Sequence, residues 1–238
     1  MKKDSKIPSH IVLFPDGNRR WAKERGVDTM EGHKEGYKRL LDFSIWCKER
    51  GIKTITAFGF STENWKRPKA EVTYLMRLLE YGFKQNFLKD SPDSKKLKTL
   101  GVRVRVIGER DHLSGFLKKA IEEAEEFTKD NNELFLNLAI SYGGRWDIVQ
   151  ATQKIVKEGI SPDKITEELF SSYLSTAGLP DPDLVIRAGG EKRFSNFVLW
   201  QAAYSELFFY PKYWPDFTEQ DLDKILKEYD ERQRRFGK

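Results

Sequence analysis

Short apolar runs alternate with longer amphipathic stretches along this chain of 238 residues. The runs are rich in β-branched and aromatic residues, and glycine, proline or charged residues bound them, which is typical of buried strands. They occupy residues 11–14, 54–60, 102–107, 134–140, 184–186 and 207–210. The pattern therefore predicts six short, buried strands.

The stretches between these runs carry apolar residues at helical spacing. The clearest repeat covers residues 113–127, where lysine and glutamate occupy the opposite face, and similar repeats cover 37–45 and 222–229. Because strands alternate with helices, we predict an α/β fold with an open, mainly parallel six-stranded sheet and helices on both faces. The sequence has no internal repeat and no linker, so we expect a single domain over residues 1–238.

Composition narrows the class of protein. Hydrophobic residues make up 39% and charged residues 33%, which is enough apolar material for a sizeable core. The net charge is +5, but basic and acidic residues are interleaved, so we expect no nucleic-acid partner. A phosphorylated substrate and an anionic membrane surface fit this balance equally well. Cys47 is the single cysteine, which excludes a disulfide framework within the chain.

Targeting signals are not indicated either. The first ten residues are charged and lack the apolar core of a signal peptide. No apolar run approaches the length of a membrane span. We therefore expect a soluble, cytoplasmic protein.

Ligands of open parallel sheets bind beyond the carboxyl ends of the strands, and the segment PDGNRRW follows the first predicted strand. Gly17 permits close approach of the backbone to an anion, and Arg20 offers a planar fork for phosphate oxygens. Asp16 suits Mg²⁺, which usually takes few carboxylates together with substrate phosphates. A plain Asx turn that caps a helix is the alternative interpretation.

A second candidate anion site is RAGGEKRFSN, residues 187–196. Arg187, Arg193 and Ser195 around two glycines can clamp a diphosphate, although a mobile glycine loop with solvated charges has the same composition. The segment FSTENWKRP, residues 60–68, fits either a capped helix start or a loop that covers a partly apolar substrate. This segment alone does not decide between the two.

Other chemistries lack support in the sequence. His10, His33 and His112 fit no catalytic-triad spacing, and no GxxxxGK[ST] motif indicates a P-loop NTPase. We interpret the GGR segment at 143–145 as a strand-to-helix turn, with Arg145 paired to an acid.

Several long blocks, in this order, resemble the signature blocks of the cis-prenyltransferases, and most of all those of the undecaprenyl diphosphate synthases. The blocks are HIVLFPDGNRRWAKERG, GHKEGYKRL, FSTENWKRP, NLAISYGGRWDIV, PDLVIRAGGEKRFSNFVLWQAAYSELFFYPKYWPDF and the terminal RRFG. The resemblance runs from about His10 to Gly237. It implies a parallel sheet with surrounding helices, a long apolar tunnel and a homodimer. It also implies a Mg²⁺-dependent reaction in which an allylic diphosphate accepts isopentenyl diphosphate units with cis double bonds.

The resemblance assigns roles to residues at matching positions. The implied catalytic residues are Asp16, Asn18 and Ser61, and the implied metal ligands are Asp16 and Glu206, the latter through water or a partner subunit. The residues implied to bind the allylic diphosphate are Gly17, Asn18, Arg19, Arg20 and His33. Those implied to bind isopentenyl diphosphate are Arg67, Arg187, Arg193, Ser195 and Gly237. Those implied to position the substrates are Trp21, Phe60, Glu63, Asn64 and Trp65.

The resulting hypothesis is a cis-prenyltransferase that elongates farnesyl or geranylgeranyl diphosphate into a medium-to-long Z-polyprenyl diphosphate. Gly59 is small where a bulky residue would narrow the tunnel, and the segment 89–101 is extended relative to common bacterial relatives. The alternatives are a short-chain Z-prenyl diphosphate synthase and a non-catalytic partner subunit of a heteromeric synthase. Peripheral contact with a membrane for product release is a further expectation.

Two departures from the family pattern bear on affinity. Thr29 stands where many relatives carry an arginine, and Ala188 stands where they carry a hydroxyl side chain. Arg19 is a candidate to replace the missing arginine. The final proton acceptor stays open between released pyrophosphate and a water relay, because the amide of Asn18 is a poor base.

Overall fold

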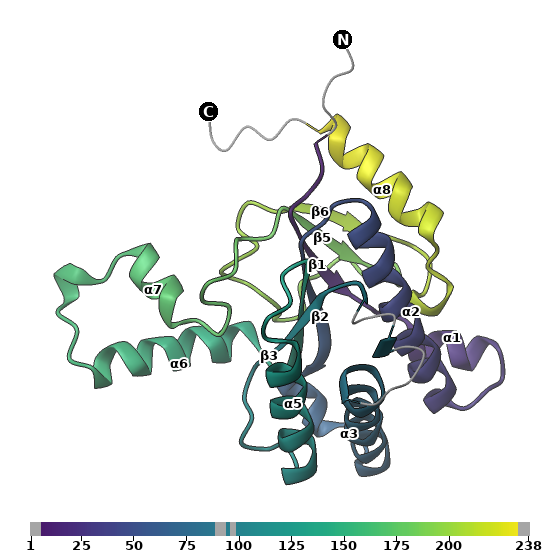
Figure 1. Ribbon diagram of the computed structural model, residues 1–238, viewed down its shortest axis with the longest axis horizontal. Helices are drawn as coiled ribbons and strands as arrows, with labels where there is room; N and C mark the ends of the chain where they lie inside the picture. Colours follow the sequence, from purple (N-terminus) through teal and green to yellow (C-terminus); the bar gives the residue numbers. More distant parts are fainter. Residues whose placement is uncertain (1–5, 89–93, 96–98, 233–238) are drawn as a thin grey trace.

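The computed structural model describes residues 6–88, 94–95 and 99–232, and all six predicted strands form within two residues of their predicted limits (Figure 1). The strands are β1 (His10–Phe14), β2 (Thr54–Ser61), β3 (Val102–Ile107), β4 (Leu134–Tyr142), β5 (Leu184–Arg187) and β6 (Glu206–Phe209). They pair in the order β3-β4-β2-β1-β5-β6, and every pair is parallel. The predicted fold class is confirmed.

The helices connect the strands, as parallel pairing requires. The α-helices are α1 (Asn18–Glu24), α2 (Thr29–Glu49), α3 (Lys69–Phe83), α5 (Gly115–Thr128), α6 (Gly144–Lys157), α7 (Glu167–Tyr173) and α8 (Glu219–Glu231). The shorter turns are η1 (Thr62–Lys66), η2 (Lys84–Leu88), η3 (Pro162–Lys164) and η4 (Trp214–Asp216). The three helical repeats of the sequence correspond to α5, α2 and α8.

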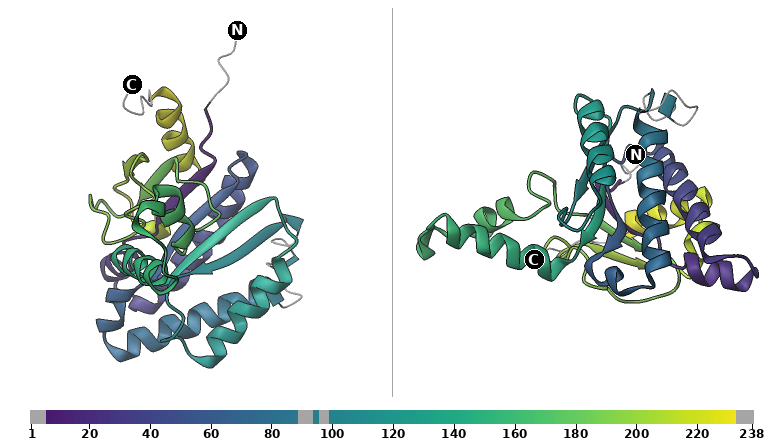
Figure 2. Two further views of the ribbon diagram at one scale, coloured as in Figure 1. Left: turned by 90° about the vertical axis from the view of Figure 1, so that its left-hand side faces the viewer. Right: turned by 90° about the horizontal axis from the view of Figure 1, so that it is seen from below.

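The two faces of the sheet are covered differently. Alternate residues of β1 point to opposite faces, so that Ile11 and Leu13 join the core formed with α2, α3, α5 and α8. Val12 and Phe14 join a smaller core with the segment that includes Phe197. Helices on both faces were expected, but an irregular segment covers much of the second face. Helices α6 and α7 instead extend away from the sheet as an arm (Figure 2).

Side chains protect the free edge of β3. The Glu125 carboxylate accepts a hydrogen bond from the Val106 amide at 2.7 Å, and the Thr128 hydroxyl accepts one from the Val104 amide at 3.1 Å. Arg110 pairs with Glu125 at 2.7 Å and also donates to the Val106 carbonyl. These contacts occupy the polar groups that an exposed edge strand would offer to another chain.

Asp221 ties β6 to α8. Its side chain is 1% exposed and accepts hydrogen bonds from Lys212 Nζ at 2.8 Å, Tyr210 Oη at 2.7 Å and the Thr218 amide at 2.9 Å. Burial by itself raises the pKa of Asp221, but these hydrogen bonds outweigh burial and lower the pKa to about 2. Asp221 is therefore held ionised in the interior.

No described helix is both long and apolar enough to cross a membrane. The extended segment predicted at 89–101 falls mostly outside the described residues.

Candidate functional site

The candidate site lies at the centre of the sheet, where the chain order reverses. From β1 the chain continues to β2 on one side, whereas β5 and β6 lie on the other side. Phe14 at the end of β1 pairs with Arg187 at the end of β5, so the loops after both strands leave from the same edge. A switch point of this kind is where open α/β sheets bind ligands.

A cavity of about 1050 Å³ opens at this edge. The predicted site residues that line it are Asp16, Gly17, Asn18, Arg19, Arg20, His33, Ser61, Glu63, Asn64, Arg67, Arg187, Arg193 and Ser195. Six basic side chains and three carboxylates line the cavity, an excess of three positive charges. Val27, Phe58 and Leu75 supply apolar surface. The two clusters of the sequence therefore meet in one cationic, partly apolar cavity.

Three residues expected to position substrates do not line this cavity. Trp21 Nε1 donates to Asp216 at 2.8 Å, away from the cavity, and Phe60 is 1% exposed within the core. Trp65 packs on Phe60 with 4.9 Å between ring centroids, and its Nε1 donates to Ser141 at 2.9 Å. Any effect of these aromatic residues on substrates must therefore pass through the loops that they support.

The loop after β1 fixes Asp16 and opens α1. Gly17 has a φ of 101° and cannot carry a side chain there, because a Cβ would lie 2.6 Å from Cδ1 of Tyr213. The Gly17 amide donates to Asp16 Oδ1 at 2.6 Å. Gly189, with a φ of 84°, packs as closely against Arg20, since a Cβ there would lie 2.8 Å from Nη2. Gly17 thus brings the loop after β1 against Tyr213, which follows β6, and Gly189 brings the loop after β5 against Arg20 and Asp16.

Arg187 is the buried cation of the site. Its side chain is 5% exposed, and Nη2 pairs with Asp16 Oδ2 at 2.8 Å. Nη1 donates to Ser195 Oγ at 2.8 Å and to the carbonyl of Arg193. Ser195 has a φ of 47°, in the left-handed region, which turns the loop back toward the strand end. Arg187 thus joins the loops after β1 and β5.

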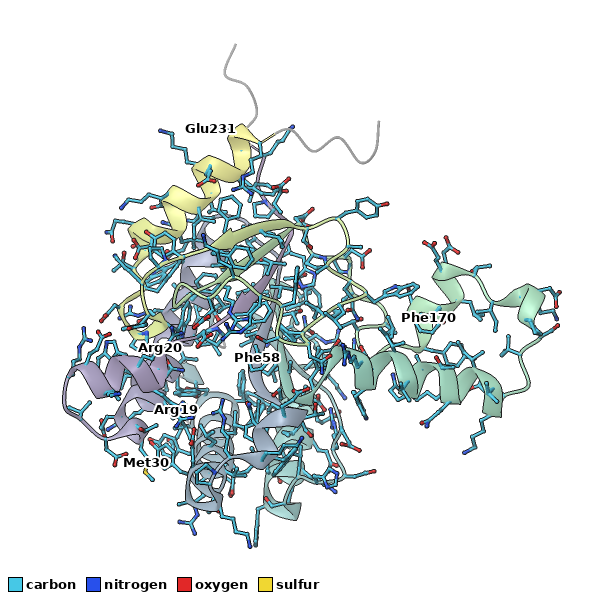
Figure 3. All side chains as sticks on the ribbon, turned by 180° about the vertical axis from the view of Figure 1, so that it is seen from behind. Arg19, Arg20, Met30, Phe58, Phe170 and Glu231 are labelled. Carbon is cyan, nitrogen blue, oxygen red and sulfur yellow. The ribbon has the colours of Figure 1, made fainter. Side chains whose placement is uncertain are left out.

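Two carboxylates besides Asp16 each contact more than one arginine. Glu191 Oε1 lies 3.1 Å from Arg20 Nη1, and Oε2 pairs with Arg193. Glu71 Oε1, on α3, lies 3.0 Å from Arg67 and 3.8 Å from Arg19. Figure 3 shows Arg19 and Arg20 on opposite sides of α1, although they are adjacent in sequence. Arg19 therefore faces α3, whereas Arg20 faces the loop after β5.

His33 lies on the α3 side of the cavity, with Nε2 3.6 Å from Glu71 Oε1. Burial lowers its pKa, and although Glu71 opposes this shift, Arg67 and Arg19 reinforce it. Neutral His33 can accept or donate one hydrogen bond to a ligand in the cavity. Asn18 also lines the cavity, and its Oδ1, which is buried against Gly36 of α2, lacks a hydrogen-bond partner among the described residues.

The segment after β2 resolves the ambiguity of FSTENWKRP. Ser61 precedes the short turn η1, and its amide donates to Asn64 Oδ1 at 3.2 Å, as a capped turn would. Glu63 accepts a hydrogen bond from Asn196 at 2.7 Å. Burial alone raises the pKa of Glu63, but the hydrogen bonds outweigh it and lower the pKa. The capped turn is confirmed, and because the same turn lines the cavity, its role in covering a substrate stays a prediction.

The GGR segment forms the predicted strand-to-helix turn, with Gly143 immediately before α6. The Arg145 amide donates to Asn196 Oδ1 at 2.9 Å. An acidic partner for the Arg145 side chain was expected, but none is found in the part of the chain that the structure describes.

Glu206 does not share the cavity with Asp16. It begins β6 and pairs with Leu184, at the amino end of β5, whereas Asp16 follows the carboxyl end of β1. Its carboxylate binds Arg232 at 2.8 Å. Parallel strands present their starts at the opposite edge of the sheet, so the role of Glu206 through water or a partner subunit stays a prediction. Gly237 lies outside the described residues.

The sequence analysis missed four residues that the structure brings to the site. Lys23 and Asn196 line the cavity, Glu191 joins its two loops, and Glu71 lies behind three of its basic residues. Lys23 could have been found, since it lies one helical turn beyond Arg20 on the same face. Glu71 could not, because it comes near only through the packing of α1 and α3 on α2.

Of the three carboxylates that line the cavity, Asp16 is the candidate metal ligand. Among the described residues there is no group of three or more His, Cys, Asp or Glu side chains that could hold an ion. Asp16 is about one-third exposed in the cavity, next to cations that attract phosphate. This donor set fits Mg²⁺, which commonly takes one or two carboxylates and completes its shell with phosphates and water.

Comparisons with known proteins identify the family of this chain. The model of the family described as "Putative undecaprenyl diphosphate synthase" matches residues 14–237. An isoprenyl transferase of Aquifex aeolicus is 48% identical over 233 residues, covering 98% of this chain and 97% of the relative.

Two crystal structures share the fold. A lavandulyl diphosphate synthase of Lavandula x intermedia, in complex with dimethylallyl diphosphate, has a TM-score of 0.90 and 40% identity. It covers 97% of this chain and 98% of its own. A probable undecaprenyl diphosphate synthase of Campylobacter jejuni has a TM-score of 0.80 and 33% identity, covering 98% and 100%.

The chain therefore belongs to the undecaprenyl diphosphate synthase family of prenyltransferases. The predicted class of enzyme, one that transfers prenyl groups, is confirmed.

Proposed function

We propose that this enzyme condenses isopentenyl diphosphate units onto an allylic diphosphate, farnesyl or geranylgeranyl diphosphate, and releases a medium-to-long Z-polyprenyl diphosphate. The observation that carries the proposal is the single cavity in which two arginine clusters flank Asp16. Two diphosphates need two cationic subsites, and condensation needs both in one cavity. The apolar side chains of Val27, Phe58 and Leu75 offer a surface for the prenyl chain.

The residues of the cavity then divide into two diphosphate subsites. Arg19, Arg20 and the Gly17 amide bind the allylic diphosphate, and Arg67, Arg193 and Ser195 bind isopentenyl diphosphate. Arg187, which is buried against Asp16, holds the two loops at a fixed separation. Because the reacting carbons are held side by side, much of the entropic barrier to condensation is removed on binding.

The reaction breaks the allylic C–O bond, and the bonding electrons leave with the diphosphate. Arg20 stabilises this developing negative charge. The double bond of isopentenyl diphosphate supplies the electron pair of the new C–C bond, and a proton then leaves the added unit. Asn18 and Ser61 orient that unit, and the proton passes to released pyrophosphate or to a water relay.

Mg²⁺ belongs to this proposal as the bound cofactor, with Asp16 as its protein ligand. When bound, it neutralises charge on the departing diphosphate. Asp16 Oδ1 is paired with Arg20 in the free chain, so a diphosphate that engages Arg20 would free this carboxylate oxygen for the metal. Glu206 can contribute only through water or a second copy of the chain.

The proposal also includes the predicted oligomeric state, location and product length. Exposed Val149 and Val156 on the α6 arm, 54% and 72% accessible, support a homodimer. The single domain, the cytoplasmic location, the apolar tunnel and the peripheral membrane contact stay predictions. Gly59 lines the cavity, which supports a product longer than one addition.

The test supplies the purified chain with Mg²⁺, labelled isopentenyl diphosphate and one of several allylic starters. Reversed-phase chromatography should show a ladder of several added units, with farnesyl or geranylgeranyl diphosphate used best. Dimethylallyl diphosphate is included among the starters because a structural relative binds it. This relative also favours a short-chain synthase as the second candidate function. A single addition would establish that alternative. No incorporation with any starter would instead favour a partner subunit that needs a catalytic subunit.

The division of the cavity is tested by Arg193→Ala. This variant should raise the KM for isopentenyl diphosphate about tenfold, and the KM for the allylic substrate by much less, because a charge-assisted contact to one diphosphate is lost. Equal effects on both constants would show that the two subsites are assigned wrongly.

A further inference from the structure

Two carboxylates, Glu71 and Glu191, connect the arginines of the cavity in pairs. Glu191 contacts Arg20 and Arg193, and Glu71 contacts Arg19 and Arg67. With the subsites assigned as proposed above, each carboxylate joins one arginine of the allylic subsite to one of the isopentenyl subsite. We call Glu71 and Glu191 the bridging carboxylates.

Glu191 is a bridge in which each oxygen takes one guanidinium. Oε1 lies 3.1 Å from Arg20 Nη1, and Oε2 pairs with Arg193. The side chain is 31% exposed, and the loop after β5 carries it between the two arginines. A diphosphate that binds Arg20 must compete with this carboxylate, and so must one that binds Arg193.

Glu71 shares a single oxygen among its partners. Oε1 lies 3.0 Å from Arg67 and 3.8 Å from Arg19, with His33 at 3.6 Å. The side chain is only 13% exposed, so solvent screens these charges less than at the surface. A carboxylate oxygen that moves toward one arginine necessarily weakens its contact with the other.

We infer that Glu71 and Glu191 are positioning residues that couple the two diphosphate subsites. When a diphosphate binds one arginine of a pair, the bridging carboxylate contacts only the other arginine. The carboxylate then neutralises the charge of that second arginine more completely. Occupancy of one subsite therefore weakens binding at the other, and by linkage the effect is reciprocal. This inference rests on the proposed function, because it uses the assignment of two subsites.

The coupling also affects turnover. Each cycle leaves pyrophosphate on the arginines of the cavity, and the bridging carboxylates compete with it for the same guanidinium groups. A variant that lacks a bridging carboxylate should bind pyrophosphate and both substrates more tightly. Release then slows, so kcat and KM fall together. Simple damage to the site would lower kcat and raise KM instead.

The experiment measures binding of isopentenyl diphosphate by calorimetry, with and without a saturating, unreactive thio-analogue of farnesyl diphosphate. In the wild-type chain the analogue should weaken isopentenyl diphosphate binding. In Glu191→Gln and Glu71→Gln each ligand alone should bind about fivefold more tightly, the upper range for a partly exposed ion pair. The weakening by the analogue should shrink by a similar factor, and pyrophosphate should inhibit turnover at lower concentration.

Two further variants distinguish the loss of a bridge between two arginines from the loss of a negative charge. Glu63 lines the same cavity but binds Asn196 instead of an arginine, so Glu63→Gln removes one carboxylate without removing a bridge. It should change both affinities and leave the coupling factor as in the wild type. Glu191→Asp keeps the charge but shortens the side chain, so it should lose coupling like Glu191→Gln.

Three outcomes would overturn the inference. The first is an unchanged coupling factor in Glu71→Gln and Glu191→Gln. The second is an equal loss of coupling in Glu63→Gln, which would mean that only the net charge of the cavity matters. The third is absence of binding of either ligand to the wild-type chain, which would overturn the proposed function as well. Binding of both ligands with unchanged coupling refutes the bridges alone.

Discussion

The ion pair between Asp16 and Arg187 offers the clearest quantitative prediction. Carboxylates on loops usually contribute little to stability, but Asp16 neutralises a guanidinium that is only 5% exposed. The atoms are 2.8 Å apart. Unit charges at about 3 Å attract by roughly 5 kcal/mol at an effective dielectric constant of about 20. Asp16 is about one-third exposed, and we discount this figure to about 2–3 kcal/mol for solvent screening.

The pair is tested by a double-mutant cycle on unfolding in urea, followed by tryptophan fluorescence. Asp16→Asn should lower the free energy of unfolding by about 2–3 kcal/mol, because Arg187 is left buried without its acid. Arg187→Met removes the buried charge itself. The double variant should therefore be more stable than the sum of the single losses predicts, by about 2 kcal/mol.

Additive losses, within about 0.5 kcal/mol, would refute this reasoning. They would mean that Ser195 and the Arg193 carbonyl are sufficient partners for the guanidinium. Activity gives an independent readout, since Asp16→Asn should lose turnover by orders of magnitude even where the chain is fully folded.

Three other predictions follow from contacts described above. Glu125→Ala leaves the Val106 amide and Arg110 unpaired, so it should lower the free energy of unfolding by about 1–3 kcal/mol, whereas Glu125→Gln should lose less. Gly189→Ala should raise the KM for the allylic diphosphate and destabilise the fold by about 1–2 kcal/mol, because a Cβ is strained at a φ of 84°. Asp221 has a depressed pKa of about 2. Its contribution to the free energy of unfolding is therefore complete above about pH 4 and is lost as the pH falls toward 2. In Asp221→Asn the free energy of unfolding should vary over this pH range by roughly 2 kcal/mol less than in the wild type, as measured by unfolding at several pH values.

The sheet could be predicted from the sequence because burial on both faces leaves a strong signal. All five residues of β1 are buried, and such strands are continuous apolar runs that end at the turn residues. The irregular cover of the second face could not be predicted. Phe197 and Val198 have the composition of a strand or helix, but the segment turns instead, with left-handed backbone at Ser195, Asn196 and Val198.

The residues of the site could be predicted where they lie at the ends of strands. Asp16 and Arg187 were found because each directly follows an apolar run, and the pairing of β1 with β5 brings them to 2.8 Å. The role of Glu206 came from the resemblance alone, and within one chain this residue lies at the opposite edge of the sheet. Glu71 and Asn196 depend on contacts between distant elements, which periodicity does not encode.

The central claim is that one cavity holds two diphosphates on two sets of arginines, and a crystal structure with both ligands tests it most directly. The crystals would contain isopentenyl diphosphate, Mg²⁺ and the unreactive thio-analogue of farnesyl diphosphate. The account predicts one diphosphate on Gly17 and Arg20 and the other on Arg193 and Ser195, with the metal at Asp16. A single diphosphate that engages both clusters at once, or two that bind elsewhere, would contradict it.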